Sequence, residues 1–195
     1  MKKCFIVLVS FLLLLSCEKS EDQSEDSVKE YELTDIKFEP VKEDGIQKAD
    51  IEFDGGHARN TTATSVFLPF VVEKEVDDEQ SAFTMSQTLP QEIASRNDVY
   101  VDVPDIMGSR FSGRVLFNEV PQSKNRVFKC TDETMELPGY TEYSITCRIH
   151  GYKQTNEFTA TFKEIHSGET IKIKGKWSGV KYSNVETRGV LSELK

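Results

Sequence analysis

Period-two alternation of apolar and polar residues recurs along this chain of 195 residues, and it constrains the fold more than any other feature. The apolar segments after residue 28 are short, and Val99-Tyr100-Val101-Asp102-Val103 is a clear case. Successive side chains of a β-strand point to opposite faces, so this pattern is typical of strands with one buried face. The sequence therefore predicts an all-β chain, with one short helical turn near residues 91–96.

About nine strands are expected between residues 28 and 195, which we expect to form a single β domain without internal repeats. Each sheet must bury one of its faces, so an antiparallel β-sandwich is the predicted architecture, with a partly open barrel as the alternative. Pro69 interrupts the strand predicted at residues 66–72. Because proline cannot donate a ladder hydrogen bond, that strand should lie at an edge or carry a bulge.

Two turn signals predict hairpins in which apolar residues face each other. A turn at Asp44-Gly45 would place Phe38 opposite Ile51. A turn at Ser167-Gly168 would place Phe158 opposite Trp177, which makes Trp177 a predicted core residue.

Cys130 and Cys147 are the two cysteines that follow the amino-terminal region of the chain, and a turn signal at Pro138-Gly139 lies midway between them. A two-residue hairpin at that turn would place the two thiols directly opposite each other. Their Cα atoms would then be about 4.5 Å apart, within the range that a disulfide accepts. The sequence predicts a Cys130–Cys147 disulfide; two buried free thiols and a redox or metal role are the alternatives.

The first residues of the chain have the composition of a secretory leader. Lys2 and Lys3 precede the apolar stretch at residues 5–15, which is too short to span a bilayer of about 30 Å as a helix. The motif Leu14-Leu15-Ser16-Cys17 that follows resembles the cleavage site of bacterial lipoproteins. That resemblance implies a signal peptide at residues 1–16 and a Cys17 that carries diacylglycerol and an amide-linked acyl chain such as palmitate. An ordinary secretory leader with an incidental cysteine is the alternative.

Residues 17–27 consist of Cys17 and the acidic tract that follows it. This tract cannot bury apolar surface, so it should be a solvated tether. It resembles the export signal of surface lipoproteins in the Bacteroidota, which implies an outer-membrane protein whose domain faces the cell exterior; the periplasmic side is the alternative. The formal net charge of −9 also argues against a nucleic-acid partner.

Motifs for chemistry are scarce. His57, His150 and His166 are scattered without zinc-ligand spacing. The series Asp50, Glu52 and Asp54 imitates the start of a calcium loop, but Thr61 stands where a bidentate glutamate is required, so the polar face of a strand is the simpler interpretation. The sequence predicts no catalytic residue, metal site or cofactor.

Three segments resemble the pore-forming module of aerolysin-type toxins: Asn60-Thr61-Thr62, Val99 to Pro104, and Ile173 to Val180. In that family, long strands flank an amphipathic loop that rearranges into a membrane barrel. The chain departs from the pattern before Val99, where Phe83 to Gln87 is too short to be that loop.

Three function classes remain open at this stage. A lipid-anchored, non-enzymatic surface binding or structural protein, held to the membrane through Cys17 and with a protein or glycan as ligand, is favoured. A small aerolysin-type β-pore-forming protein and a hydrolase without a recognised motif are the alternatives. The ligand itself is not predicted by any motif.

Overall fold

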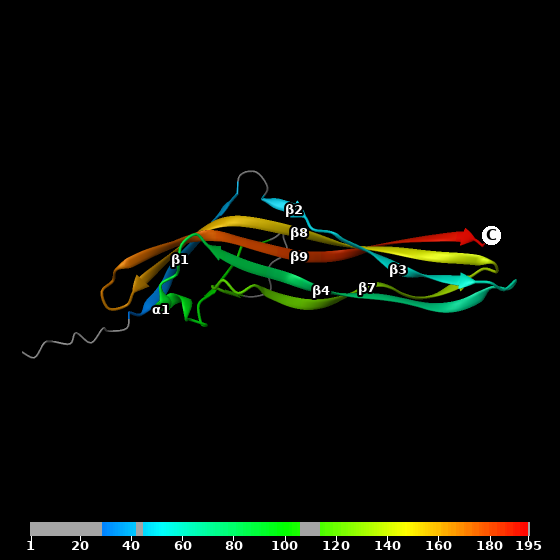
Figure 1. Ribbon diagram of the computed structural model, residues 1–195, viewed down its shortest axis with the longest axis horizontal. Coiled ribbons are helices and arrows are strands. Elements are labelled where there is room, and N and C mark those ends of the chain that lie inside the picture. The colour runs from blue at the N-terminus through cyan, green and yellow to red at the C-terminus, as the bar shows by residue number, and fades with distance from the viewer. Residues whose placement is uncertain (1–28, 42–44, 106–113, 195) are drawn as a thin grey trace, which may run out of the picture.

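The structure, a computed structural model, describes residues 29–41, 45–105 and 114–194. These residues form an elongated and almost entirely β molecule, as the alternation predicted (Figure 1). The elements are β1 Tyr31–Pro40, β2 Ile46–Lys48, β3 Ile51–Asn60, β4 Val66–Met85, α1 Gln91–Ala94, β5 Tyr100–Val101, β6 Val115–Leu116, β7 Gln122–Leu137, β8 Thr141–Glu164 and β9 Thr170–Glu193.

The antiparallel pair of β8 and β9 runs the length of the molecule and organises the other strands. The main sheet has the order β1-β8-β9-β4-β7. β2 and β3 also pair with β8, nearer to the amino-terminal end of β8 than β1 does. We call the end that holds β1, β5 and β6 the head, and the end that holds β3, β7 and the carboxyl end of β9 the arm (Figure 1). The fold is therefore an all-β antiparallel architecture without a closed barrel.

In the arm, the strands separate into two layers. β4 pairs with β7 over residues 66–78, whereas β9 pairs with β4 only at residues 175–180 and otherwise continues along β8. Side chains of β4 and β7 pack against those of β3 and β8, with Val72, Ile145 and Cys147 buried between the layers. This half of the molecule is sandwich-like, in agreement with the prediction. Pro69 lies where β4 has a ladder neighbour on one side only, as expected.

In the head, aromatic side chains fill the core. Trp177 and Phe162 are fully buried, and Phe83, Phe117 and Phe158 are nearly so. Phe117 packs edge-on against Phe158, with ring centroids 5.5 Å apart, and lies 5.1 Å from Phe83. Such pairs contribute beyond their buried area because of the ring quadrupole. The head core therefore depends on Phe117, which lies outside the main sheet.

The head and the arm meet at a waist, where the ladders are irregular. β4 changes register between Asp78 and Ser81, and Glu79 there has φ 51°. The carboxylate of Asp78 is 3 % exposed and accepts hydrogen bonds from the backbone N–H of Tyr182 at 2.8 Å and of Glu79 at 2.9 Å. Arg126 lies 3.5 Å from its second oxygen. Asp78 thus satisfies backbone donors that the irregular ladder leaves without a strand partner.

The hairpin predicted at Asp44-Gly45 is wrong. β1 and β3 do not pair with each other; both pair with β8, so that Phe38 lies opposite Phe158 and Ile51 opposite Ile149. The two strands follow one another along β8 because the return strand is long enough to hold both. The alternation of each segment was still interpreted correctly as strand.

The hairpin predicted at Ser167-Gly168 is confirmed, with a register that differs by two residues. Phe158 lies opposite Gly175 and Trp177 opposite Asn156, because the connection is longer than a two-residue turn. Gly168 has φ +75° in that connection, a conformation that favours glycine. A shift by two keeps every side chain on its predicted face, so Trp177 is a core residue as expected. The helical turn near residues 91–96 is also present, as α1.

Replacing Asp78 tests the role of the waist carboxylate. Asp78→Ala should lower the free energy of unfolding by roughly 1–3 kcal/mol, because it leaves the buried backbone N–H of Tyr182 and the partly buried N–H of Glu79 without an acceptor. Urea unfolding followed by far-UV circular dichroism measures the change. Asp78→Asn keeps one acceptor oxygen and should lose clearly less; equal stability of wild type and Asp78→Ala would contradict this role.

Candidate functional site

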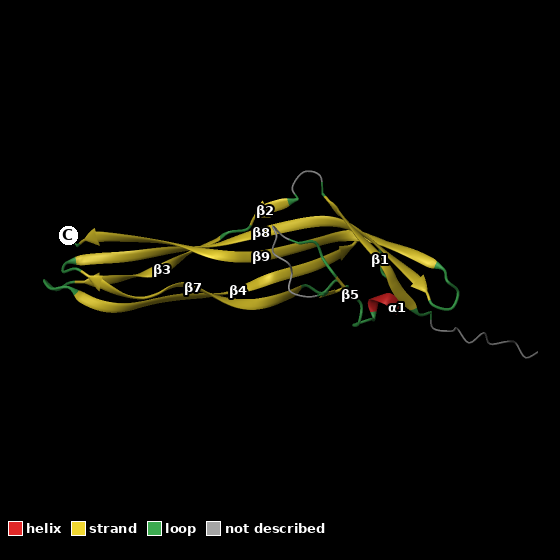
Figure 2. Ribbon diagram, turned by 180° about the vertical axis from the view of Figure 1, so that it is seen from behind, coloured by secondary structure: helices red, strands yellow, loops and turns green. Residues whose placement is uncertain are grey.

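One segment of the head stands apart from the main sheet. Residues 86–121 connect the long strands β4 and β7, and their described parts contain α1, β5 and β6. β5 and β6 pair only with each other in the part of the chain that the structure describes. Figure 2 shows α1 and β5 at the head end, beside β1. We call residues 86–121 the docked segment.

Alternate side chains of the docked segment are buried against the head core. Val99 and Val101 are buried on the β5 side, and Val115 and Phe117 on the β6 side. Tyr100, between the first two, is 51 % exposed. One face of this short hairpin thus covers the aromatic core and the other faces solvent, which makes the hairpin amphipathic in the period of a β-strand.

Polar contacts that fasten the docked segment to the rest of the head come mainly from side chains. Gln122 bonds through its amide to both backbone groups of Leu116, at 3.0 and 2.7 Å. The carboxylate of Glu119 accepts from the Met85 N–H at 3.2 Å. Arg96 donates to the carbonyl of Tyr31. The backbone N–H of Ser86 also donates to the carbonyl of Lys174 on β9, at 2.8 Å. Apart from that bond at the end of β4, the segment can leave the head without breaking the ladders of the main sheet.

The position of this segment corrects one expectation. The sequence comparison with aerolysin-type modules sought a long loop before Val99 and found only Phe83 to Gln87. The structure places Val99 within the docked segment, because β4 ends at Met85 and the next strand of the main sheet begins at Gln122. An amphipathic segment flanked by long strands is therefore present.

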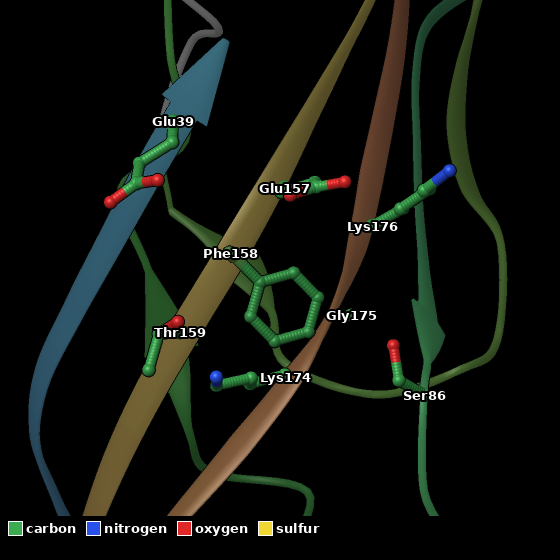
Figure 3. Close-up of a pocket in the computed structure, with 8 residues that line it drawn as sticks. All are labelled: Glu39, Ser86, Glu157, Phe158, Thr159, Lys174, Gly175 and Lys176. Carbon is green, nitrogen blue, oxygen red and sulfur yellow. The ribbon is translucent and has the colours of Figure 1, made fainter. Parts of the chain in front are cut away.

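A depression of about 350 Å³ lies over β8 and β9 in the head (Figure 3). It is lined by charged and hydroxyl side chains around Phe158 and Gly175: Glu39, Glu157, Lys174, Lys176, Ser86 and Thr159. A Cβ at Gly175 would lie 2.8 Å from the Phe158 ring, so glycine is needed for the close packing there. Glu157 pairs across the strands with both Glu39 and Lys176.

His150 lies between two carboxylates on the surface of the waist. Its Nδ1 is 3.3 Å from Asp50, and its Nε2 is 3.3 Å from Glu186. Asp50 also accepts from the backbone N–H of Gly151 at 3.2 Å, and this hydrogen bond is the main cause that holds the pKa of Asp50 below its usual value. These contacts join the start of β3 to β8 and β9. His57 and His166 lie elsewhere on the surface.

The three acidic residues of the imitated calcium loop have separate partners. Asp50 contacts His150, Glu52 forms an ion pair with Arg148 at 2.6 Å, and Asp54 accepts from the N–H of Gly56 at 2.8 Å. In the described ranges, no three side chains of histidine, cysteine or acidic residues are placed to hold a metal ion. Glu52 and Asp54 lie on the exposed face of β3, which agrees with the simpler interpretation.

Cys130 and Cys147 meet between the two layers of the arm. β7 pairs with β4 and not with β8, so the hairpin that placed the thiols opposite each other is wrong. They come together across the layers instead, where both contact the cluster of Val72 and Ile145. Both cysteines are free thiols in the structure. Burial, and next the contact with Cys130, raise the pKa of Cys147 to about 12. A thiol with that pKa is a poor nucleophile, and the disulfide stays a prediction.

Other residues of interest fall outside the description. Cys17 and the acidic tract up to residue 27 lie outside the described residues, as do residues 106–113 within the docked segment. In the described residues, no helix is long and apolar enough to cross a membrane.

The fold resembles that of several solved structures. The parasporin-2 toxin of Bacillus thuringiensis, which recognizes cancer cells, superposes with a TM-score of 0.55 at 8 % identity, over 84 % of this chain and 75 % of that chain. A non-toxic crystal protein of Bacillus thuringiensis gives 0.48 at 10 % identity over 87 % of each chain. An aerolysin-like protein of Bombina maxima gives 0.44 at 8 % identity, over 81 % of this chain and 97 % of that chain.

Parasporin-2 is a toxin and the Bombina maxima protein is described as aerolysin-like, whereas the second Bacillus thuringiensis protein is non-toxic. No protein-family model matches the chain, and no curated protein has a sequence similar to it. At such low identity the likeness to parasporin-2 shows a shared fold and nothing of its recognition of cells.

Sequence reasoning missed the docked segment as a unit, although its signals were present. The alternation of residues 99–103 predicts a strand, and the structure has β5 there. What the sequence did not reveal is that β5 and β6 pair with each other and cover the head core.

The cysteine pair gives a chemical prediction. Protein prepared under oxidising conditions should be about 2 Da lighter than the reduced chain, and it should not react with a thiol reagent after denaturation without reductant. Cys130→Ser should lower the free energy of unfolding by about 3 kcal/mol under oxidising conditions, by loss of the closed loop. Wild type assayed with reductant is the control. Alkylation of both cysteines in unreduced protein would contradict the disulfide.

Proposed function

We propose that this chain is a lipid-anchored protein of the bacterial cell surface whose docked segment leaves the head and inserts into a membrane to form a β-pore. One observation carries the proposal: an amphipathic segment between two long strands is held to the head by side-chain packing and not by a sheet ladder. The likeness in fold to the parasporin-2 toxin supports it.

The docked segment has the length and pattern that a transmembrane hairpin needs. A strand crosses a bilayer with about 9–11 residues, and residues 86–121 supply more than two such strands. The side chains now buried against the core, Val99, Val101, Val115 and Phe117, would face lipid. Asp102 and Arg114, which are exposed, would face a water-filled lumen.

The outer edges of a single hairpin carry backbone N–H and C=O groups that find no hydrogen-bond partner in lipid. Hairpins from several copies of the chain must therefore pair to close a barrel. The partners of this chain are therefore a lipid bilayer and further copies of itself. Release of the segment would expose Phe83, Phe158 and Phe162, and each large side chain that leaves its burial costs roughly 1.5–3 kcal/mol. Burial in lipid and a closed ladder must offset that cost, so the soluble form should keep the segment docked.

The lipid anchor at Cys17 fits this geometry. The described chain starts at the head, next to β1 and α1 (Figure 1). Residues 17–28 can reach at most about 40 Å when fully extended, so an acylated Cys17 would keep the head near a membrane. We include in the proposal that the domain faces outward from the outer membrane and that the protein is not an enzyme.

Two neighbouring substitutions test the insertion. Val103→Lys places a charge on the face that would meet lipid, where it costs about 2–4 kcal/mol, whereas Asp102→Lys changes the lumen face. Soluble protein with Cys17→Ser should release dye from lipid vesicles. Val103→Lys should reduce that release at least about tenfold, and Asp102→Lys should leave it within about twofold.

Circular dichroism and thermal unfolding of both variants control for folding, since Val103 is only partly buried and Asp102 is exposed. Intact vesicles with the wild-type protein, or equal release by two folded variants, would refute the pore.

The anchor has its own prediction. Intact mass of the membrane-extracted protein should show cleavage before Cys17 and acyl chains on it, and Cys17→Ser should release the protein from the membrane. Protease added to whole cells should degrade the domain. An unmodified mature chain would contradict the anchor, and full protection on whole cells that ends on lysis would place the domain on the periplasmic side.

A further inference from the structure

We propose that Lys172, Lys174 and Lys176 of β9 form a binding track for a linear anionic glycan. The three lysines occupy alternate positions of one strand and are all exposed. Ile173 and Trp177, on the opposite face of the same strand, are fully buried in the head core. This site goes beyond the pore proposal, because its lysine side chains lie on the face of β9 opposite to Ile173 and Trp177, which the aromatic core buries.

The spacing of the ammonium groups fits a repeating anion. Alternate residues of a strand are about 6.5–7 Å apart, so the three lysine side chains start at regular intervals along one face of β9 and place positive charge on both sides of the strand axis. Lys174 lies across from Thr159, and Lys172 across from Thr161, on β8. Their hydroxyl groups can bond to sugar hydroxyls while the ammonium groups bind carboxylate or sulfate groups.

The three lysines lack acidic partners, unlike several other lysines of the chain. Lys37, Lys124, Lys129 and Lys181 form ion pairs with carboxylates. Among the described residues, no carboxylate lies within 4.0 Å of the ammonium groups of the track. In a chain with a formal net charge of −9, a row of three exposed lysines without an ion-pair partner offers cations to an anionic ligand.

The depression of about 350 Å³ gives the track a place for a sugar ring. Figure 3 shows Lys174 extending toward Thr159 and Lys176 extending to the other side of β9, toward β4. Ser86 lies on the β4 side of the depression, so hydroxyl groups border it on both sides. Polar groups around a shallow hollow suit a saccharide better than an apolar ligand.

The acidic neighbours of the track favour a glycan strand over an anionic bilayer. Glu157 borders the track on β8, and Asp35 and Glu39 follow on β1, all exposed. A flat anionic membrane that covered this face would meet these carboxylates as well as the lysines. A single polysaccharide chain can lie along β9 and avoid them.

Binding to defined probes tests the track. The full mature chain with Cys17→Ser is titrated with an oligogalacturonate, which carries carboxylates, and with a heparin-derived oligosaccharide, which carries sulfates. A neutral maltooligosaccharide and phosphatidylglycerol vesicles are the comparison probes. We expect binding to at least one anionic oligosaccharide at low salt, weaker binding as salt rises, and none to the neutral sugar.

A matched pair of triple variants assigns the site. Lys172→Gln, Lys174→Gln and Lys176→Gln together should weaken binding at least about tenfold, because each loses a charge-assisted hydrogen bond. The control changes three exposed lysines away from the track, Lys48, Lys129 and Lys153, to glutamine and removes the same charge. It should bind within about threefold of wild type.

Three results would overturn the track: no binding to either anionic oligosaccharide, an equal loss in both folded variants, or binding to the vesicles alone. Circular dichroism verifies the fold of each variant. The track variant should still release dye from vesicles of neutral lipid, so failure of the track and failure of the pore are distinguishable.

Discussion

The apolar face of β8 is covered along its whole length, and the rest of the structure depends on how this is done. In the arm, the second layer of β4 and β7 provides the cover, with Val72 packed against Ile145 and Cys147. In the head, β4 joins the same sheet as β9, so it cannot also lie over it. The docked segment covers the head instead, with Phe117 packed against Phe83 and Phe158.

This division is the reason why we place the proposed function in the head. Side chains that are buried in a sheet-on-sheet layer are held by ladders as well as by packing, whereas Val99, Val101 and Phe117 are held by packing and a few side-chain bonds. In the proposed pore, lipid would cover these same apolar side chains instead of the head core. The opposite face of the head sheet, with Lys172 to Lys176, is solvent-exposed and remains available to a ligand while the segment is docked.

The sequence was sufficient to predict the strands and insufficient to predict how they pair. Alternation identifies which side chains share a face, and a register error of two at Ser167-Gly168 leaves that assignment intact. Pairing between strands that are adjacent in the sequence is only one possibility, and it failed at Asp44-Gly45 because β8 is long enough to pair with both β1 and β3. Cys130 and Cys147 do lie together, but through the packing of two layers and not through a hairpin. The docked segment required knowledge of which surface of the sheet was left uncovered, which no local pattern contains.

Hydrogen exchange measured by mass spectrometry, with and without lipid vesicles, tests the central claim most directly. If the docked segment leaves the head and builds a barrel, amides of residues 99–103 and 114–120 should exchange more slowly with vesicles than without them, as a full ladder replaces the short pairing of β5 with β6. Amides in the arm portion of β8 and β9 should be unchanged, because that ladder takes no part. Equal exchange of residues 99–103 and 114–120 in the two conditions, with the protein shown to be vesicle-bound, would contradict the account.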